Sequence, residues 1–122
     1  LAAVGPDDVG GLRRGRAGIA TGEFRALFLS AAGALLCEET VGQDGVAPLP
    51  GKIIRRALAL EAYGIVLSRG EACGDPVATE SDIVSGCMLH RAARLMGMRL
   101  HDHLVIGLSD HASLREAAIL PE

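Results

Sequence analysis

Apolar residues recur along this chain with two different periods, which predict strands and helices in turn. Residues 23–30 and 34–41 are apolar-rich runs on either side of Gly33, and we expect a β-hairpin there because glycine suits such turns. Between residues 51 and 62 the apolar side chains recur at helical spacing, so this segment is predicted to be a helix. Pro50 stands where proline commonly opens a helix.

The second half of the chain shows the same change of period. Residues 65–67 form a wholly apolar run, typical of a central strand, and Gly64 is expected to close the helix before it. A helix is predicted over residues 83–96 and a strand over residues 100–107, whereas residues 113–120 suit either an edge strand or a short helix. This order predicts an α/β fold in a single domain, with a mixed β-sheet flanked by helices.

Length and composition agree with one domain and a less ordered N-terminal segment. A chain of 122 residues with 49% hydrophobic content is long enough for a single core. Residues 1–22 show neither period, so we expect a poorly structured lead-in, followed by the domain at residues 23–122. Arg13, Arg14 and Arg16 cluster in the lead-in; we favour a solvated tail over contact with an acidic partner.

Charge, aromatic content and hydropathy argue against several classes of protein. The net charge is −3 and the aromatic side chains are Phe24, Phe28 and Tyr63, which argues against nucleic acid as a partner. No run reaches the roughly 18 apolar residues of a membrane-spanning helix, and the first residues lack a secretory signal pattern. Three cysteines without CxxC spacing fit a reduced, cytoplasmic compartment better than a disulfide framework.

Residues 68–82 hold most of the candidate chemistry. They follow the predicted central strand and lead into a helix, a place where loops commonly carry functional side chains. The charged or reactive residues of this segment are Arg69, Glu71, Cys73, Asp75, Glu80 and Asp82. We therefore take residues 68–82 as the candidate functional segment.

Several stretches of the chain resemble the RadC-type JAB/MPN domain, from about residue 23 to residue 120. The likeness is carried by Pro-Gly-Lys-Ile-Ile-Arg-Arg-Ala-Leu at residues 50–58 and by Ile-Val-Leu at residues 65–67. Its most distinctive parts are Leu-His-Asp-His-Leu-Val-Ile-Gly at residues 100–107 and Ser-Leu-Arg-Glu at residues 113–116. The resemblance implies a mixed sheet with flanking helices, in agreement with the hydrophobic periods.

Active members of this family are zinc metalloproteases of the JAMM type, and the resemblance implies where such a site would lie. Two histidines and an aspartate hold the metal, and an upstream glutamate acts as general base on the bound water. Counted along the second strand from Leu29, the general base falls on Glu39, and the Ser-x-x-Asp element, aligned without gaps, falls on Thr79 and Asp82. The two histidine positions fall on Arg69 and Glu71, so two of the three metal ligands are replaced.

These replacements predict that ordinary zinc chemistry is lost. Glu71 and Asp82 retain carboxylates at metal positions, but Arg69 is a permanent cation without a lone pair. We therefore expect no cofactor; if the site still bound a metal, that metal would be zinc. The expected function is that of a non-catalytic scaffold or binding module for an unidentified protein partner. The alternatives are a metal-dependent hydrolase with an altered, oxygen-rich site, and a DNA-repair-associated protein, as the family name suggests.

Arg69 has two interpretations. In the first, its guanidinium supplies the positive charge that zinc would supply and pairs with carboxylates among Glu39, Glu71 and Asp82. In the second, Arg69 points to solvent and the loop is unconstrained. We favour the first.

Other residues have a simpler reading beside the functional one. Thr79 and Asp82 also have the spacing of a helix capping box, and Ser81 is an equally good N-cap. His101 and His103 are expected on one face of a strand, where they could bind a metal; we favour a structural role away from the loop.

Two further side chains complete the candidates. His90 is expected in a solvated or boundary position of a helix. Cys73 would need a basic partner to act as a nucleophile, and we do not favour that role.

Overall fold

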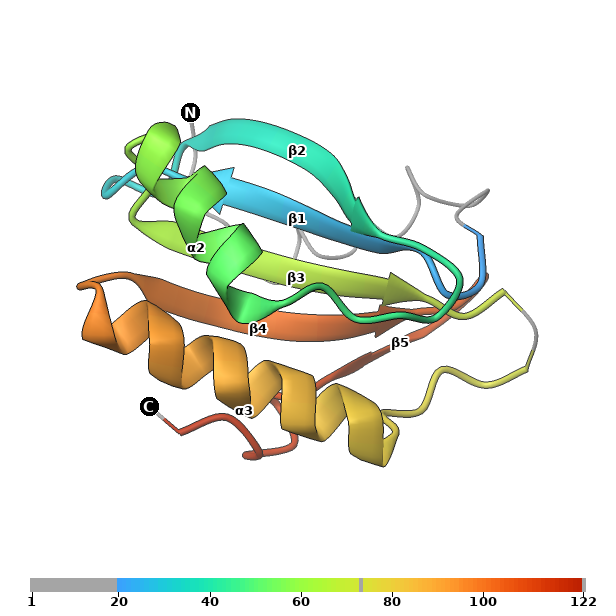
Figure 1. Ribbon diagram of the computed structural model, residues 1–122. Helices are drawn as coiled ribbons and strands as arrows, with labels where there is room; N and C mark the ends of the chain where they lie inside the picture. The colour runs from blue at the N-terminus through green and yellow to red at the C-terminus, as the bar shows by residue number, and fades with distance from the viewer. Residues whose placement is uncertain (1–19, 73, 122) are drawn as a thin grey trace.

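The computed structural model describes residues 20–72 and 74–121, and these form a five-stranded mixed sheet with two helices (Figure 1). In chain order the elements are β1 (Phe24–Leu29), β2 (Leu35–Gly42), α2 (Pro50–Ala59), β3 (Gly64–Gly70), α3 (Glu80–Leu95), β4 (Arg99–Ile106) and β5 (His111–Ser113). The strand order is β2-β1-β3-β4-β5, with β3 and β4 parallel and joined through α3. The predicted α/β architecture with a mixed sheet is confirmed.

The N-terminal hairpin forms where the sequence places it. Gly33 has a φ of 85°, a left-handed conformation that glycine adopts without a steric penalty. Its amide donates to the Ser30 carbonyl over 2.9 Å, and the Ser30 amide donates to the Ala34 carbonyl over 2.8 Å. β1 then pairs antiparallel with β2 on one side and with β3 on the other.

Both helices cover the same face of the sheet, and the main core lies between them and the strands (Figure 1). β3 is buried along its whole length, as expected of a central strand. Side chains that alternate along the strands meet those of the helices in this core: Phe24, Ala26, Phe28, Ile65, Leu67 and Leu100 from the sheet, with Ile53, Ala57, Leu89 and Ala93 from the helices. Burial of this apolar surface provides the main driving force for folding.

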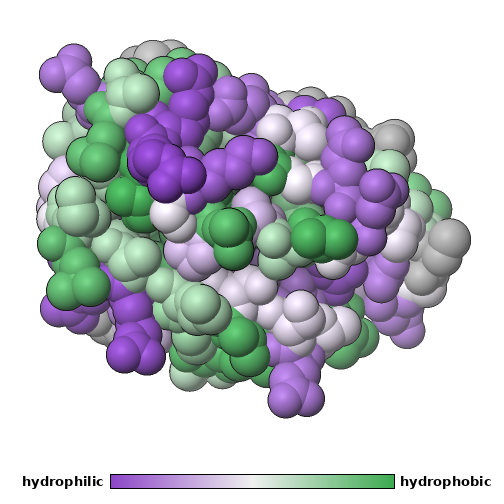
Figure 2. Space-filling model, in the orientation of Figure 1, coloured by the Kyte–Doolittle hydropathy of each residue, from purple (hydrophilic) through white to green (hydrophobic). Residues whose placement is uncertain are grey.

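A smaller buried cluster occupies the opposite face of the sheet. It consists of Leu29, Val66, Leu104 and Ile106. On the helix-covered face some hydrophobic residues remain exposed among polar ones (Figure 2). α3 contributes three of these: Val84, Met88 and Leu95.

The end of α2 and the start of β3 differ from the prediction. α2 ends at Ala59 and the chain reverses at Glu61, which has a φ of 55°, so Gly64 does not close the helix. Gly64 instead begins β3, where a Cβ atom would lie 2.4 Å from the Nε2 atom of His101. The absence of a side chain at Gly64 therefore leaves room for the imidazole of His101.

β3 is also longer than the three apolar residues predicted as a strand. Ser68, Arg69 and Gly70 belong to the strand rather than to the loop, and they pair with Leu104, Val105 and Ile106 of β4. The sequence reasoning ended the strand at the first polar residue. The polar side chains here are buried, so polarity does not mark the strand end.

The prediction that His101 and His103 share a face is wrong. The pairing of β3 with β4 shifts at this point: Leu100 lies opposite Ile65, whereas Asp102 lies opposite Val66. Such a bulge adds one residue to β4 and breaks the strict alternation of side chains. His101 therefore approaches Gly64 while His103 lies buried among the residues of the helix-covered face.

The C-terminal segment is neither an edge strand nor a helix over residues 113–120. The edge strand is β5, which ends at Ser113, and turns follow it. Residues 1–19, and with them Arg13, Arg14 and Arg16, lie outside the described residues, so the predicted lead-in stays a prediction. Across residues 20–72 and 74–121, neither helix has the length and apolarity needed to cross a bilayer.

Candidate functional site

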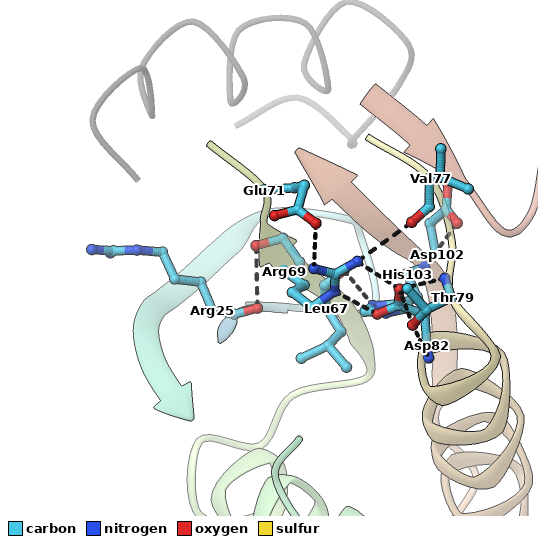
Figure 3. Close-up of polar contacts among 10 residues, drawn as sticks. Arg25, Leu67, Arg69, Glu71, Val77, Thr79, Asp82, Asp102 and His103 are labelled. Atoms are coloured by element: carbon cyan, nitrogen blue, oxygen red, sulfur yellow. Dashed lines mark hydrogen bonds and ion pairs between the residues drawn. The ribbon is translucent and has the colours of Figure 1, made fainter. Parts of the chain in front are cut away.

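An ion pair joins the end of β3 to the start of α3 (Figure 3). The Nε atom of Arg69 donates to Oδ1 of Asp82 over 2.8 Å, and its Nη2 atom donates to Oδ2 over 2.8 Å. Two parallel bonds between a planar guanidinium and a carboxylate are among the strongest polar contacts in proteins. Arg69 is 9% exposed and Asp82 is 2% exposed, so the pair is buried, and the interpretation that Arg69 points to solvent is wrong.

Thr79 holds Asp82 in place and begins α3. Its side chain accepts a hydrogen bond from the Asp82 amide over 3.2 Å, while its own amide donates to Oδ2 of Asp82 over 2.8 Å. This reciprocal arrangement is the capping box that the spacing predicted. Ser81 is not the N-cap, because α3 already begins at Glu80.

His103 reaches the same carboxylate from β4 (Figure 3). Its Nε2 atom lies 3.1 Å from Oδ1 of Asp82, and its Nδ1 atom lies 3.3 Å from the carbonyl oxygen of Leu67. The imidazole is fully buried and stacks on the ring of Phe24 at a centroid distance of 6.5 Å. The interpretation that His103 lies away from the loop is therefore wrong: it supports the buried pair.

The ionisation of the pair follows from these contacts. Burial raises the pKa of Asp82, but hydrogen bonds from His103, Arg69 and the Thr79 backbone lower it by more, so the pKa lies well below its ordinary value. The hydrogen bond to Asp82 raises the pKa of Arg69. Both groups are therefore charged, and the segment contains a fixed, internally neutralised ion pair.

Glu71 and Glu39 have different places relative to this pair. The Oε1 atom of Glu71 lies 3.6 Å from Nη1 of Arg69, so this carboxylate also faces the guanidinium. Glu39 lies on β2 and accepts a hydrogen bond from Nε of Arg56 on α2 over 2.8 Å, which raises the pKa of Arg56. The structure thus brings Arg69, Glu71 and Asp82 together, and it pairs Glu39 with a different arginine.

The donor set does not fit a zinc ion. Asp82 accepts five hydrogen bonds, from Arg69, Thr79 and His103, which fills the roughly four lone-pair directions of a carboxylate. The guanidinium of Arg69 occupies the space next to that carboxylate and adds a positive charge. Within residues 20–72 and 74–121, no three histidine, cysteine or acidic side chains are grouped so as to hold a metal.

Sequence reasoning missed the reason why residues 100–107 and 113–116 occur together. The side chain of Asp102 accepts hydrogen bonds from the Ser113 hydroxyl and from the Arg115 amide. The Arg115 guanidinium donates to the carbonyls of His101 over 2.6 Å and of Leu100 over 2.8 Å. These hydrogen bonds therefore fasten the C-terminal turn to β4.

Comparison with known proteins agrees with these features. A family model described as the RadC-like JAB domain matches residues 6–119. A curated relative, the UPF0758 protein of Rhodobacter capsulatus, is 35% identical over 103 residues, which cover 82% of this chain and 48% of the relative. The chain thus spans about half the length of the curated relative it matches. The match of the family model over nearly the whole chain shows that the chain belongs to the family of RadC-like JAB domains.

Proposed function

We propose that this chain is a non-catalytic RadC-like JAB domain that serves as a scaffold or binding module. The observation that carries the proposal is the buried, bidentate pair between Arg69 and Asp82. Arg69 stands at a histidine position of the family motif, and Asp82 stands at the position of its aspartate ligand. An ion pair of protein groups thus takes the place of a metal–carboxylate contact.

Arg69 can link β3 to α3 as a metal ion would, but it cannot supply the chemistry of a metal ion. A metal ion at this point would link β3 to the start of α3, and the Arg69–Asp82 pair makes the same link. A guanidinium cannot polarise and deprotonate a water molecule as a zinc ion does, because it offers no open coordination position. The expected result is a stable domain without hydrolase activity.

The remaining catalytic position supports this proposal. Glu39 would be the general base of an active family member, and here its carboxylate is bound to Arg56. That carboxylate is engaged with an arginine of α2 and not with the Arg69–Asp82 pair. The hydroxyl position of the motif, Thr79, is likewise engaged in capping α3.

Metal binding by the wild type and by a variant that restores the motif tests the proposal. Protein purified without chelator and then dialysed against zinc should hold no stoichiometric metal and show no zinc-dependent peptidase activity. The double variant Arg69→His with Glu71→His restores both histidine positions and should gain zinc, measured by elemental analysis. Adding Asp82→Asn to the double variant should remove that gain, which serves as the matched control.

A different outcome would favour the alternative hydrolase. If the wild type bound zinc or another divalent metal at one equivalent, and Asp82→Asn abolished that binding, the non-catalytic proposal would be wrong. Salt-dependent binding of duplex DNA, lost on replacing Arg13, Arg14 and Arg16 with glutamine, would instead support a nucleic-acid role.

A further inference from the structure

A cavity of about 250 Å³ lies at the end of the sheet remote from the Arg69–Asp82 pair. It is formed where α3 ends, β4 begins and the C-terminal turn returns, and none of the positions aligned with the JAMM metal site lines it. Its described lining residues are Tyr63, His90, Arg94, Met98, Arg99, Arg115 and Pro121. Four of these seven side chains are basic or imidazole groups, and none is a carboxylate.

The arginines of this cavity come from three separate parts of the chain. Arg94 lies in the last turn of α3, Arg99 begins β4, and Arg115 lies in the C-terminal turn. A cation near a helix C-terminus is favoured by the helix dipole, which explains Arg94. This reason does not apply to Arg99 or Arg115, and Arg94 also has a partner of its own within the protein. The charges that an anion in the cavity could meet are therefore those of Arg99 and Arg115.

Arg115 is a fixed cation whose charge is not neutralised by its partners. Its guanidinium donates to the carbonyls of Leu100, His101 and Pro121, and the last of these bonds measures 3.2 Å. Three bonds use three of the five N–H groups, and all three acceptors are uncharged. The guanidinium thus keeps its full positive charge and two further donors at a position set by the backbone.

His90 lines the cavity from α3. The residue is 6% exposed, and its Nδ1 atom is buried without a hydrogen-bond partner. The expectation of a solvated or boundary position is therefore wrong. Burial, and then the charges of Arg94, Arg115 and Arg99, lower the pKa of His90, so these arginines act on the ring that lines the cavity.

We propose that this cavity binds an anionic group, a phosphate monoester or a carboxylate, on a small molecule or at the end of a larger one. The planar guanidinium of arginine forms bidentate hydrogen bonds with two oxygens of a phosphate or carboxylate group. The volume lies just below the range of about 300 to 1,000 Å³ for sites that enclose a small molecule, so a charged group with a small attached body fits. Tyr63 and Met98 provide an apolar wall for that body.

A titration followed by NMR tests the proposal on the intact chain. Phenyl phosphate and benzoate are added separately at constant ionic strength, with sodium chloride as the blank. The expected result is a saturable shift of the backbone amides of residues 90–99 and 115 and of the His90 ring nitrogens. Tighter binding of phenyl phosphate identifies a phosphate ligand, and tighter binding of benzoate identifies a carboxylate ligand.

Two matched variants separate a built site from general electrostatic attraction. Arg99→Gln removes an exposed charge from the cavity and should weaken binding by about tenfold, the effect of losing roughly one charge-assisted hydrogen bond. Arg55→Gln removes the same charge from the exposed side of α2 and should leave the affinity unchanged. Equal weakening by both variants, or no saturable shift with either ligand, would overturn the proposal.

Discussion

Arg69 and Arg115 are held in two different ways at opposite ends of the same sheet. Arg69 lies near the end of β3, buried against the carboxylate of Asp82, and its charge is neutralised within the protein. Arg115 lies near the start of β4 and is held by three backbone carbonyls, which leave its charge unneutralised. An arginine at one end of the sheet is thus already neutralised by a carboxylate, whereas the arginine at the other end can still pair with an anion. The partner of an arginine, rather than the arginine itself, indicates what each end of the sheet can bind.

The largest expected effect comes from removing the neutralised arginine. Arg69→Ala leaves Asp82 as a buried charge without its main partner, and breaking such a pair costs about 3 to 5 kcal/mol of unfolding free energy. Urea denaturation measures this loss. Arg55→Ala, an exposed position on α2, should change stability by no more than about 0.5 kcal/mol.

The double variant Arg69→Ala with Asp82→Ala sharpens this test. Because it removes both charges, it should be destabilised by less than the sum of the two single variants. A loss below about 1 kcal/mol in Arg69→Ala would contradict the account of a buried, neutralised pair.

Acid should weaken the same end of the sheet, by less than the Arg69→Ala substitution does. The pKa of Asp82 is lower in the folded than in the unfolded protein, so its ionised form stabilises the fold at neutral pH. That contribution is present above the unfolded pKa of about 4 and is progressively lost as the pH falls below it. Urea midpoints measured between neutral pH and the acid limit of folding should show this loss in the wild type, and a smaller acid slope in Asp82→Asn. Equal slopes would mean that Asp82 is not the responsible carboxylate.

Removing Arg115 should have an intermediate effect. Arg115→Ala loses three hydrogen bonds to carbonyls, some of which water can replace, and a cost of about 2 kcal/mol is expected. Arg115→Lys keeps the charge but not the planar fork, so it should recover little of this stability. A loss as large as that of Arg69→Ala would remove the contrast between the two arginines.

The sequence predicted most of the fold because its strands and helices are separated by clear changes of period. It predicted poorly where polar residues are buried: β3 continues through Ser68 and Arg69, which polarity alone assigns to a loop. The bulge in β4 could not be foreseen either, because it depends on the pairing with β3 and on the close approach of His101 to Gly64. Local pattern cannot show a contact between strands.

The sequence predicted that a charged pair would form at the candidate site, but it identified only some of the residues that take part. Arg69 was expected to pair with one or two carboxylates among Glu39, Glu71 and Asp82, since an uncompensated cluster of carboxylates is unfavourable. Glu39 lies two strands away from Arg69, at roughly 10 Å by strand spacing, and pairs with Arg56 instead. His103 was missed because its place opposite Leu67, on the same side of the sheet as Arg69, depends on the register between β3 and β4.

The smallest of these effects concerns the support of the neutralised pair by the helix cap. Thr79 caps α3 and donates its hydroxyl to Asp82 over 2.9 Å, whereas Ser81 lies inside the first turn. Thr79→Ala should therefore cost about 1 kcal/mol, the usual loss for an N-cap, and Ser81→Ala should cost much less. Combined with Asp82→Ala, the Thr79 substitution should add little, because the capping box loses both members together. If Ser81→Ala were the more destabilising of the two single substitutions in urea, the helix would begin at a different residue in solution. Asp82 would then lose the two bonds from Thr79 that help hold its carboxylate against Arg69, and the contrast between the two ends of the sheet would weaken.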